Sequence, residues 1–310
     1  MITTVTLNAA IDKTYYLESF KIGQVSRVKT MHAVAGGKGI NVARVIQQLG
    51  YESLIIGFAG GDNGHYIRSA LNLQSLRHEF IEVSGESRIN LNIIENEKKT
   101  STEILETGPF IEGPQISEFL EVFKNEARQS KVVVLSGSLP PGVPVHFYKT
   151  LIDISQQEGA LAILDTSGEA LKEGLKAKPF MIKPNEDELK AITGQEISTE
   201  AELLHSVRGI MEQGIDCVAV SLGAKGSIVG NKGHIYRVHT PAIEVVNPVG
   251  CGDSYMAGFA IGLERGVAIE ECLMMAAAAG TANAMSEEAG NVKKDHYLHF
   301  LKETHVTRID

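Results

Sequence analysis

The sequence predicts a three-layer α/β protein, in which helices cover both faces of a mostly parallel sheet and a small β-sheet projects from it. Short apolar runs rich in β-branched residues alternate along the chain with stretches of helical periodicity. Strands that are apolar along their whole length are typical of parallel sheets buried on both faces. Two segments, at about 13–35 and 86–106, lack helical periodicity. In the second, Ile89, Leu91 and Ile93 alternate with polar residues, which indicates an antiparallel strand with one solvated face.

The elements of the main domain follow in chain order. Its strands are predicted at Ile2–Leu7, Ser53–Gly57, Val132–Ser136, Leu161–Asp165, Phe180–Lys183 and Cys217–Leu222. Helices are predicted at Asn41–Leu49, Asn63–Leu73, Ile116–Ser130, Pro144–Glu158, Glu186–Ile192 and Glu200–Gln213, and one more begins close to Asp253. Parallel sheets bind ligands beyond the carboxyl ends of their strands, so the loops of interest are 8–12, 136–141, 165–168, 184–185 and 223–226. We expect residues 1–310 to form one domain, with the projecting sheet as a lid or a homodimer contact.

Composition excludes several classes of protein. The formal net charge is −9, so no general basic field would attract nucleic acid, and bound anions must be held by individual Lys and Arg side chains. The three cysteines are scattered, without a CxxC pair, which favours a reducing compartment over a disulfide framework or a zinc site. The start of the chain does not resemble a secretory signal, and the longest apolar stretch, 274–284, is shorter than a membrane span. We therefore expect a cytoplasmic protein with no membrane partner.

The most informative segment is 247–254, which reads NPVGCGDS. Gly250 and Gly252 leave the backbone free to turn its N–H groups toward one point, and a helix follows. A helix start attracts an anion, whereas the carboxylate of Asp253 would repel one. Both features make sense if the anion is a phosphoryl group in transfer and Asp253 takes a proton from the attacking hydroxyl. The alternative is a glycine-rich loop in which Asp253 is only a favourable first-turn residue.

A second glycine-rich segment, at 36–43, reads GGKGINVA. Its glycines would let the backbone approach a ligand, and Lys38 and Asn41 would point toward the same pocket. The chain contains no GxxxxGK[ST] loop, and no GxGxxG follows its first strand, so neither a Walker A site nor a dinucleotide fingerprint is present. Asp12, at the end of the first strand, is a candidate acceptor for sugar hydroxyls. A plain turn remains the alternative for 36–39, and a surface turn for Asp12.

Three basic residues could hold a phosphate that the substrate already carries, namely Arg27, Lys38 and Arg88. Arginine suits this task because its planar guanidinium forms paired hydrogen bonds. Arg88 is the strongest candidate, because Asn90 and Asn92 fall on the same side of its strand. The alternative for each is a solvated surface charge.

Two further segments suggest contacts with a nucleotide. In 183–188, KPNEDE, Asn185 and Glu188 share one helical face, and Glu188 could face phosphates only through a cation. This suggests magnesium held through water, although a capping box explains both residues fully and is the preferred interpretation of this segment taken alone. The glycine-rich turn of 221–226, SLGAKG, could pass beneath a nucleotide or could be a simple hairpin.

Together these segments resemble the PfkB family of ribokinase-like sugar kinases, over about residues 3–290. The resemblance rests on TLNAAID, AGGKGINVAR, SGSLPPG, DTSGEAL, IKPNEDEL, VSLGAKGS and NPVGCGDSYMAGF. Within that family, the stretch TEILETGP at 102–109 and the lysine of GGKG are most similar to the kinases that act on hexose phosphates. The resemblance implies a ribokinase-like fold with a projecting β-sheet.

The resemblance also implies roles for individual residues. Asp253 would be the general base, and the backbone of Gly250, Cys251 and Gly252 would form an anion hole. The sugar phosphate would be held by Asp12, Gly37, Lys38, Asn41, Asn90, Arg88 and Arg27, with Ser136 and Ser138 lining the cleft between the substrates. The nucleotide would contact Lys183, Asn185, Ser221, Gly223, Ala224 and Gly226, with Asn283 near the adenine and Glu188 reaching Mg²⁺ through water.

The expected reaction is ATP-dependent phosphorylation of tagatose 6-phosphate to tagatose 1,6-bisphosphate. The alternatives are phosphorylation of fructose 1-phosphate, a non-catalytic regulator that binds a nucleotide or sugar phosphate and, least of all, a dinucleotide-dependent oxidoreductase. Two residues depart from the family pattern. Ala9 stands where proline is common, which should loosen its loop, and Cys251 replaces a small residue of the anion hole. A thiol at a helix N-terminus is expected to have a lowered pKa, so we expect activity to be sensitive to oxidation.

Overall fold

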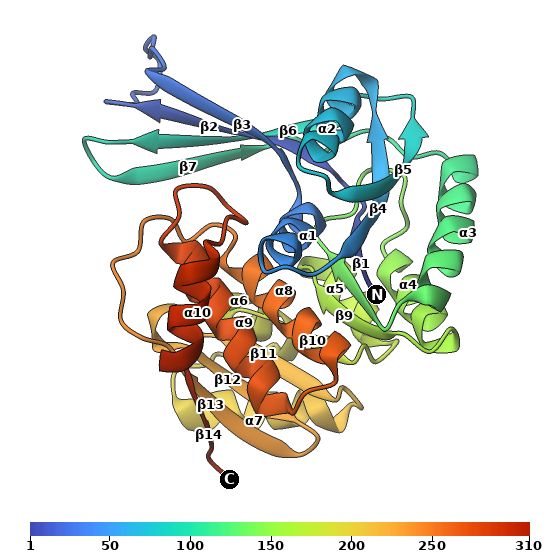
Figure 1. The fold of residues 1–310 in the computed structure, drawn as a ribbon, viewed down its shortest axis with the longest axis vertical. Helices are drawn as coiled ribbons and strands as arrows, with labels where there is room; N and C mark the ends of the chain where they lie inside the picture. Colours follow the sequence, from blue (N-terminus) through green and yellow to red (C-terminus); the bar gives the residue numbers. More distant parts are fainter.

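The computed structural model describes residues 1–310, which form a ten-stranded main sheet with helices on both faces (Figure 1). In spatial order its strands are β14 His305–Arg308, β13 His234–His239, β12 Ser227–Asn231, β11 Cys217–Ser221, β10 Met181–Ile182, β9 Leu161–Asp165, β8 Val132–Ser136, β1 Ile2–Thr6, β4 Ser53–Gly60 and β5 Arg77–Val83. All pairings from β5 to β11 are parallel, and β12, β13 and β14 add an antiparallel edge. The predicted α/β architecture is confirmed.

Each central strand is apolar on both sides, as β8 illustrates. Val133 and Leu135 pack into the core beneath α3 Gly113–Gln129, α4 Phe147–Gln157, α5 Gly168–Leu175, α6 Glu186–Thr193 and α7 Glu200–Glu212. Val132 and Val134 point the other way, into the core beneath α1 Lys38–Gln48, α8 Cys251–Arg265, α9 Ile269–Ala284 and α10 Lys294–Glu303. Helix α2 Gly61–Leu73 packs beside α1 through a smaller cluster. No helix is both long enough and apolar enough to cross a bilayer.

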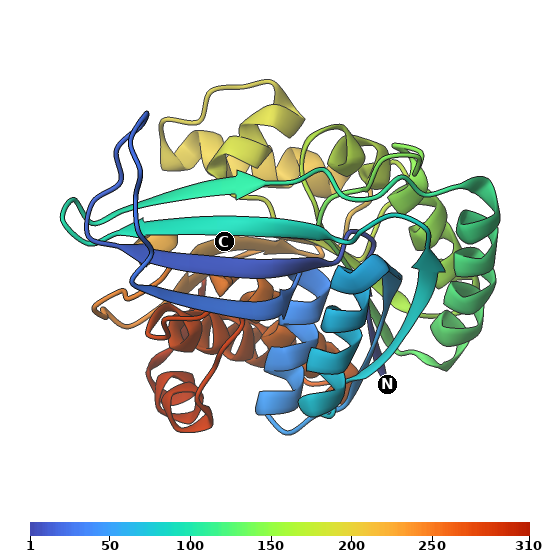
Figure 2. The same cartoon turned by 90° about the horizontal axis from the view of Figure 1, so that it is seen from above.

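The projecting sheet contains four strands, in the order β3 Thr30–Gly36, β2 Ala10–Leu17, β6 Arg88–Glu95 and β7 Thr100–Leu105. Figure 2 shows it extending beyond the helices that cover the main sheet. Its outer pairs are antiparallel, as predicted for this segment, but the central pair β2–β6 is parallel, with Asp12 opposite Asn90. The purely antiparallel interpretation is therefore wrong at the centre. Both central strands leave the same region of the main sheet and run outward, so they pair in parallel.

The strand order of the main sheet reverses beside β1. From β1 the chain adds β4 and then β5 on one side, whereas β8 and its successors are added on the other side. Ligands of such sheets bind in the crevice where the strand order reverses. The loops that follow β1, β8, β9 and β10 meet there, together with the base of the projecting sheet.

Several elements differ from the sequence prediction. Helix α1 begins at Lys38, three residues before the expected Asn41, and α4 begins at Phe147 instead of Pro144. Strand β10 keeps only Met181–Ile182, because Pro184 cannot donate a ladder hydrogen bond. The sequence did not predict β5, β12, β13, β14, α9 or α10. Strands β5 and β14 lie at the edges of the main sheet and are partly exposed, which weakens their apolar signal, whereas β12 and β13 contribute side chains to the cores on both faces.

Candidate active site

A cavity of about 480 Å³ opens where the strand order reverses, between the main and projecting sheets. Twelve of the side chains or backbone positions expected at the site line it. They are Asp12, Gly37, Lys38, Asn41, Arg88, Asn90, Ser136, Ser138, Lys183, Gly250, Gly252 and Asp253. The structure therefore brings together segments from both ends of the chain. The other expected residues lie outside this lining and are treated below.

The segment 247–252, which we call the anion loop, ends at the start of α8. Gly250 has φ 83° and ψ −4°, a left-handed conformation that favours glycine, and a Cβ there would lie 2.6 Å from the nitrogen of Gly290. The Asn247 side chain accepts a hydrogen bond from Val249 N at 2.9 Å, which fixes the turn. The N–H groups of Gly252 and Asp253 have no acceptor in the protein. With the helix dipole, they form a site for an anion.

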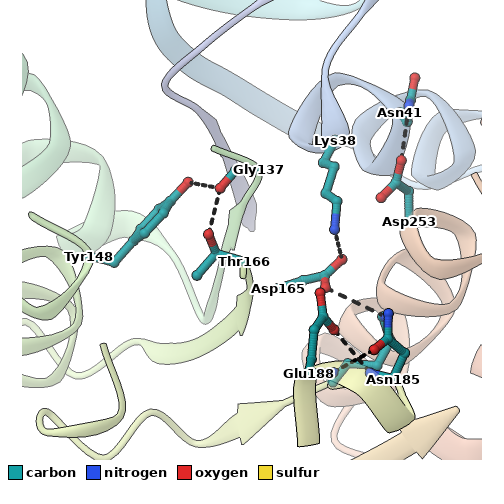
Figure 3. A network of polar contacts seen from close by, with 10 residues as sticks. Lys38, Asn41, Gly137, Tyr148, Asp165, Thr166, Asn185, Glu188 and Asp253 are labelled. Carbon is teal, nitrogen blue, oxygen red and sulfur yellow. Dashed lines mark hydrogen bonds and ion pairs between the residues drawn. The ribbon is translucent and has the colours of Figure 1, made fainter. Parts of the chain in front are cut away.

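Asp253 lies in the first turn of α8 with only 6% of its surface exposed. Its Oδ2 accepts a hydrogen bond from Nδ2 of Asn41 at 2.9 Å (Figure 3). Burial raises the pKa of Asp253 to about 6, and the charge of Asp165 adds to this, whereas Lys38, Asn41 and Lys183 lower it. A carboxylate with this pKa is ionised at neutral pH, and it is a much stronger base than an exposed aspartate.

Two lysines converge on Asp165, a buried residue at the end of β9. Nζ of Lys38 lies 3.2 Å from Oδ2 (Figure 3). Nζ of Lys183 lies 3.6 Å from Oδ1. Burial would raise the pKa of Asp165, but the two ammonium groups prevail and lower it. Burial likewise opposes the charge on Lys38, yet Asp165, Asp253 and Glu188 together raise its pKa. Lys38 is therefore held as a cation on the wall of the cavity, which Lys183 also lines.

Sequence reasoning did not assign a role to Asp165. The available signal was a carboxylate at the carboxyl end of a predicted buried strand, within the segment DTSGEAL. Lys38 was expected to grip a phosphate already on the sugar. The structure pairs it with Asp165 and places it close enough to Asp253 for that charge to raise its pKa, on the wall of the cavity.

The opposite wall comes from the projecting sheet. Oδ1 of Asp12 accepts a hydrogen bond from Nδ2 of Asn90 at 2.8 Å. A Cβ on Gly36 would lie 2.0 Å from the carboxylate of Asp12, so glycine is required where this side chain packs. Burial raises the pKa of Asp12, while Asn90 and Arg88 lower it. Nε of Arg88 donates to the carbonyl oxygen of Asn8 at 3.1 Å, which directs the guanidinium along the cavity.

The loop after β8 forms the floor between these walls. The carbonyl oxygen of Gly137 accepts hydrogen bonds from the Tyr148 hydroxyl at 2.9 Å and the Thr166 hydroxyl at 2.8 Å (Figure 3). Ser138 accepts a hydrogen bond from Asn8 at 3.3 Å. The buried hydroxyl of Ser136 has no partner in the protein and faces the cavity. Such an unpaired hydroxyl is suited to contact a polar ligand.

Arg27, Asn185 and Glu188 lie outside the cavity lining. Arg27 is exposed in the loop between β2 and β3. Asn185 and Glu188 form a reciprocal capping box at the start of α6, which is the alternative that the sequence left open. Glu188 is nevertheless close enough to Lys38 for its charge to raise the pKa of that lysine, so it stands at the rim of the site.

The residues expected along the nucleotide lie beside the cavity. Gly223 and Ala224 lie in a 3₁₀ turn between β11 and β12. Ser221 forms an isolated parallel β-bridge with Asn185. A Cβ on Gly226 would lie 2.0 Å from the carbonyl oxygen of Val238, which accounts for that glycine structurally. This turn follows β11, the neighbour of β10, and Lys183 follows β10 itself. The turn and Lys183 therefore lie at the same edge of the main sheet.

The structure gives Asn283 contacts that the family resemblance did not imply. It is fully buried in α9, and its side chain ties the anion loop to the segment that follows the helix. Nδ2 donates to the carbonyl oxygen of Val249 at 2.8 Å, and Oδ1 accepts from Gly290 N at 2.8 Å. Both ends of its amide are used inside the protein, so the side chain of Asn283 supports the anion loop.

Cys251 also corrects an expectation. Burial raises the pKa of its thiol and the charge of Asp253 raises it further, while a hydrogen bond from Asn283 lowers it. The helix N-terminus therefore does not produce a reactive thiolate here, because desolvation and the neighbouring carboxylate outweigh it.

We expect peroxide to leave this thiol largely unmodified at neutral pH. The measurement is residual activity after mild peroxide treatment, together with the mass of the peptide that contains Cys251. The Cys251→Ala variant should show the same residual activity as the wild type. Rapid inactivation of the wild type, with protection in Cys251→Ala, would show that the thiol is reactive.

Comparison with known proteins gives a consistent family signal. A family model described as pfkB family carbohydrate kinase matches residues 5–295. The chain is 36% identical over 312 aligned positions to a tagatose-6-phosphate kinase of Staphylococcus epidermidis, and the match covers 100% of both chains. It is similar to the phosphofructokinase-2 of Escherichia coli in complex with fructose 6-phosphate, with a TM-score of 0.90, 26% identity and coverage of 97% and 98%. An Arabidopsis thaliana ribokinase, at 24% identity and a TM-score of 0.79, shares the fold over 97% of this chain and 98% of its own.

Proposed function

Because this chain belongs to the pfkB family of carbohydrate kinases, as its motifs predicted, we propose that it transfers the γ-phosphoryl group of ATP to tagatose 6-phosphate. The product would be tagatose 1,6-bisphosphate. The observation that carries the proposal is the buried carboxylate of Asp253 beside N–H groups that lack a protein acceptor. A non-catalytic binding protein would have no need for a carboxylate with a raised pKa at an anion site.

The arrangement supports a direct in-line transfer. Asp253 would accept the proton of the sugar hydroxyl as that oxygen attacks the phosphoryl group. The N–H groups at the start of α8 and the ammonium of Lys38 would stabilise the charge on the migrating group. Asp12 and Asn90 would hold the sugar hydroxyls, so that the acceptor oxygen stays in line with the phosphoryl group.

The residues present fit a magnesium ion that is carried mainly by the nucleotide. No group of three or more His, Cys, Asp or Glu side chains could hold a metal ion by itself. Magnesium usually keeps several waters and binds through one or two carboxylates together with substrate phosphates. Glu188, which uses one oxygen to cap α6, is the carboxylate we propose to contact the ion through water. When bound, the ion would neutralise charge on the phosphates.

The choice of tagatose 6-phosphate rests on the relative of 36% identity, whose name states that substrate. Fructose 1-phosphate is the second candidate, and fructose 6-phosphate the third, because the same basic side chains could hold either phosphate. The test is a coupled assay of ADP release with each sugar phosphate in turn. We expect the highest kcat/KM with tagatose 6-phosphate. A preference for another sugar phosphate would reassign the substrate, and the absence of ADP release with all three would favour a regulator.

Removing the guanidinium of Arg88 should weaken binding of the phosphorylated sugar. Charged hydrogen bonds contribute about 1.5–3 kcal/mol, so Arg88→Met is expected to raise the KM for the sugar phosphate by roughly 10–100-fold. The KM for ATP and the rate with the free sugar should change little, so selectivity for the phosphorylated substrate falls. Steady-state kinetics with both sugars measures this. An unchanged KM would place the phosphate elsewhere.

We also propose a homodimer formed through the projecting sheet. Its support is a set of exposed apolar side chains on that sheet and its loops, namely Ile22, Val25, Val28, Met31, Ile104 and Leu105. Ile22→Glu combined with Val25→Glu should reduce the mass in light scattering to that of one chain. Leu73→Glu, an equally exposed position on α2, is the control that should leave the dimer intact. A wild type that is already monomeric would reject the proposal.

A cytoplasmic location is part of the same proposal. It is supported by the three cysteines, all of which are free thiols, and by the need for ATP.

A further inference from the structure

Arg44 lies on α1 behind the cavity, one turn after Asn41, with 8% of its surface exposed. Its Nη1 donates to Oδ1 of Asn41 at 3.0 Å, and its Nε donates to Oε1 of Gln74 at 3.1 Å. Its Nη2 donates to the carbonyl oxygen of Ala35. Arg44 is not among the residues that line the cavity, so it does not meet a ligand directly.

The side chain of Asn41 lies between this guanidinium and Asp253. An asparagine amide has one accepting end and one donating end, whereas a guanidinium can only donate and a carboxylate can only accept. With Oδ1 turned to Arg44, Nδ2 must turn to Asp253, as the 2.9 Å contact requires. The reversed amide would place its oxygen against the carboxylate and its N–H₂ group against the guanidinium, and both contacts would be repulsive.

We propose that Arg44 is a positioning residue for phosphoryl transfer, which locks the Asn41 amide so that it donates to Asp253 and aims that carboxylate at the acceptor hydroxyl. This inference rests on the proposed function. The chain of contacts runs from the Ala35 carbonyl and Gln74, through Arg44, to Asn41 and then to the reacting carboxylate. Neither Gln74 nor Ala35 touches Asp253, so the effect on Asp253 passes through Arg44 and Asn41.

The positive charge of Arg44 favours the ionised form of Asp253, as does the hydrogen bond from the Asn41 amide. The charged groups that face Asp253 are Lys38 on α1, Asp165 at the end of β9 and Lys183 after β10. Arg44 adds a further positive charge, which Asp12, Glu288 and Asp253 help to retain against the burial that lowers its pKa. Losing Arg44 releases the Asn41 amide that donates to Asp253 and removes a nearby cation, and each change raises the pKa of this carboxyl group.

Arg44→Met tests the proposal against a matched control, Arg68→Met. Arg68 on α2 also donates to backbone carbonyls, those of Ala59 at 3.2 Å and Phe80 at 3.3 Å, but its hydrogen bonds and its ion pair with Glu82 do not involve Asn41 or Asp253. Misplacement of a reacting group can cost about 10²-fold, so Arg44→Met should lower kcat by roughly 10–100-fold. The acid limb of its kcat–pH profile should move to higher pH. Arg68→Met should lose stability while keeping the wild-type kcat and pH midpoint.

A double-mutant cycle shows whether the effect passes through Asn41. If it does, Arg44→Met should add little, within about 2-fold in kcat, when Asn41→Ala is already present. Additive losses, or a pH midpoint in Arg44→Met equal to that of the wild type, would overturn the proposal. If Arg44→Met does not fold, Gln74→Leu releases the guanidinium from one partner and should shift the midpoint the same way by a smaller amount. An unshifted midpoint there would also overturn it.

A readout without turnover separates this inference from the proposed function. The carboxyl carbon of Asp253, labelled with ¹³C and assigned by comparison with Asp253→Asn, can be titrated by NMR. Its midpoint should rise in Arg44→Met and stay unchanged in Arg68→Met. If the wild type phosphorylates none of the sugar phosphates yet the midpoint shifts, the proposed function fails and the positioning role stands. If the wild type is active but the midpoint does not shift in Arg44→Met, the proposed function stands and the positioning role fails.

Discussion

Asp253→Asn is expected to lower kcat by roughly 10²–10⁴-fold, because the amide cannot accept the proton of the attacking hydroxyl. The replacement is nearly isosteric and leaves the anion loop in place, so affinity for ATP should change little. Turnover and nucleotide binding, measured on the same preparation, test both expectations. In the wild type, kcat should fall below about pH 6 as Asp253 becomes protonated. Turnover at the wild-type rate in the variant would remove Asp253 from the mechanism.

The same substitution should change stability in a pH-dependent way. Folded Asp253 has a pKa of about 6, above its ordinary value of 3.8, so between these pH values the folded state binds more protons than the unfolded chain. The free energy of unfolding therefore falls as pH rises through this window. Above it, the buried charge costs about 1–3 kcal/mol, which Asp253→Asn should recover. Denaturant unfolding at pH 8 and pH 4 should show a stabilised variant only at pH 8.

Asp165→Asn should have the second-largest effect, on stability as well as on activity. The carboxylate is 2% exposed and compensates the charges of Lys38 and Lys183. Breaking a buried ion pair from one side costs roughly 3–5 kcal/mol, because the remaining charge is left uncompensated. This cost applies to Lys183, whose side chain is 9% exposed, whereas Lys38 is 42% exposed and is stabilised by solvent. The free lysines should also shift toward Asp253, lowering its pKa and reducing kcat.

The control for this prediction is Asp153→Asn. Asp153 on α4 forms an ion pair with Lys149 at 2.7 Å, but its side chain is 38% exposed. Exposed pairs contribute about 0–1 kcal/mol, so this variant should unfold at nearly the wild-type denaturant concentration. If Asp165→Asn were as stable as Asp153→Asn, the three-residue cluster would have no structural role.

The sequence predicted well the features that depend on local pattern. The run Val132–Ser136 is apolar at every position but the last, and only a strand covered on both faces explains that. Asp253 could be found because glycines on one side and a helical period on the other mark a helix start. The base of the projecting sheet was predictable from alternation in 88–95, although its parallel pairing with β2 was not, since alternation does not encode the direction of the neighbour.

The features that sequence did not predict depend on contacts between distant segments. In the sequence, Asp165 resembles any aspartate at the end of a strand, because its two lysine partners lie in other elements. Arg44 and Asn283 sit within helical periods, where nothing local distinguishes a buried polar clamp from a solvated residue. Cys251 shows the reverse error, because a local rule about helix N-termini was outweighed by burial and by a neighbouring carboxylate.

The hydrogen bond between Asn41 and Asp253 joins positions 212 residues apart in the chain. A ribosome would therefore release nearly the whole parallel sheet before the partner of Asn41 has even been synthesised. Such a nascent chain could bury much of its interior while remaining unable to catalyse, and it would expose the surfaces that α8 and α9 later cover. Late completion of this kind gives chaperones and proteases a long interval in which to act on an unfinished molecule.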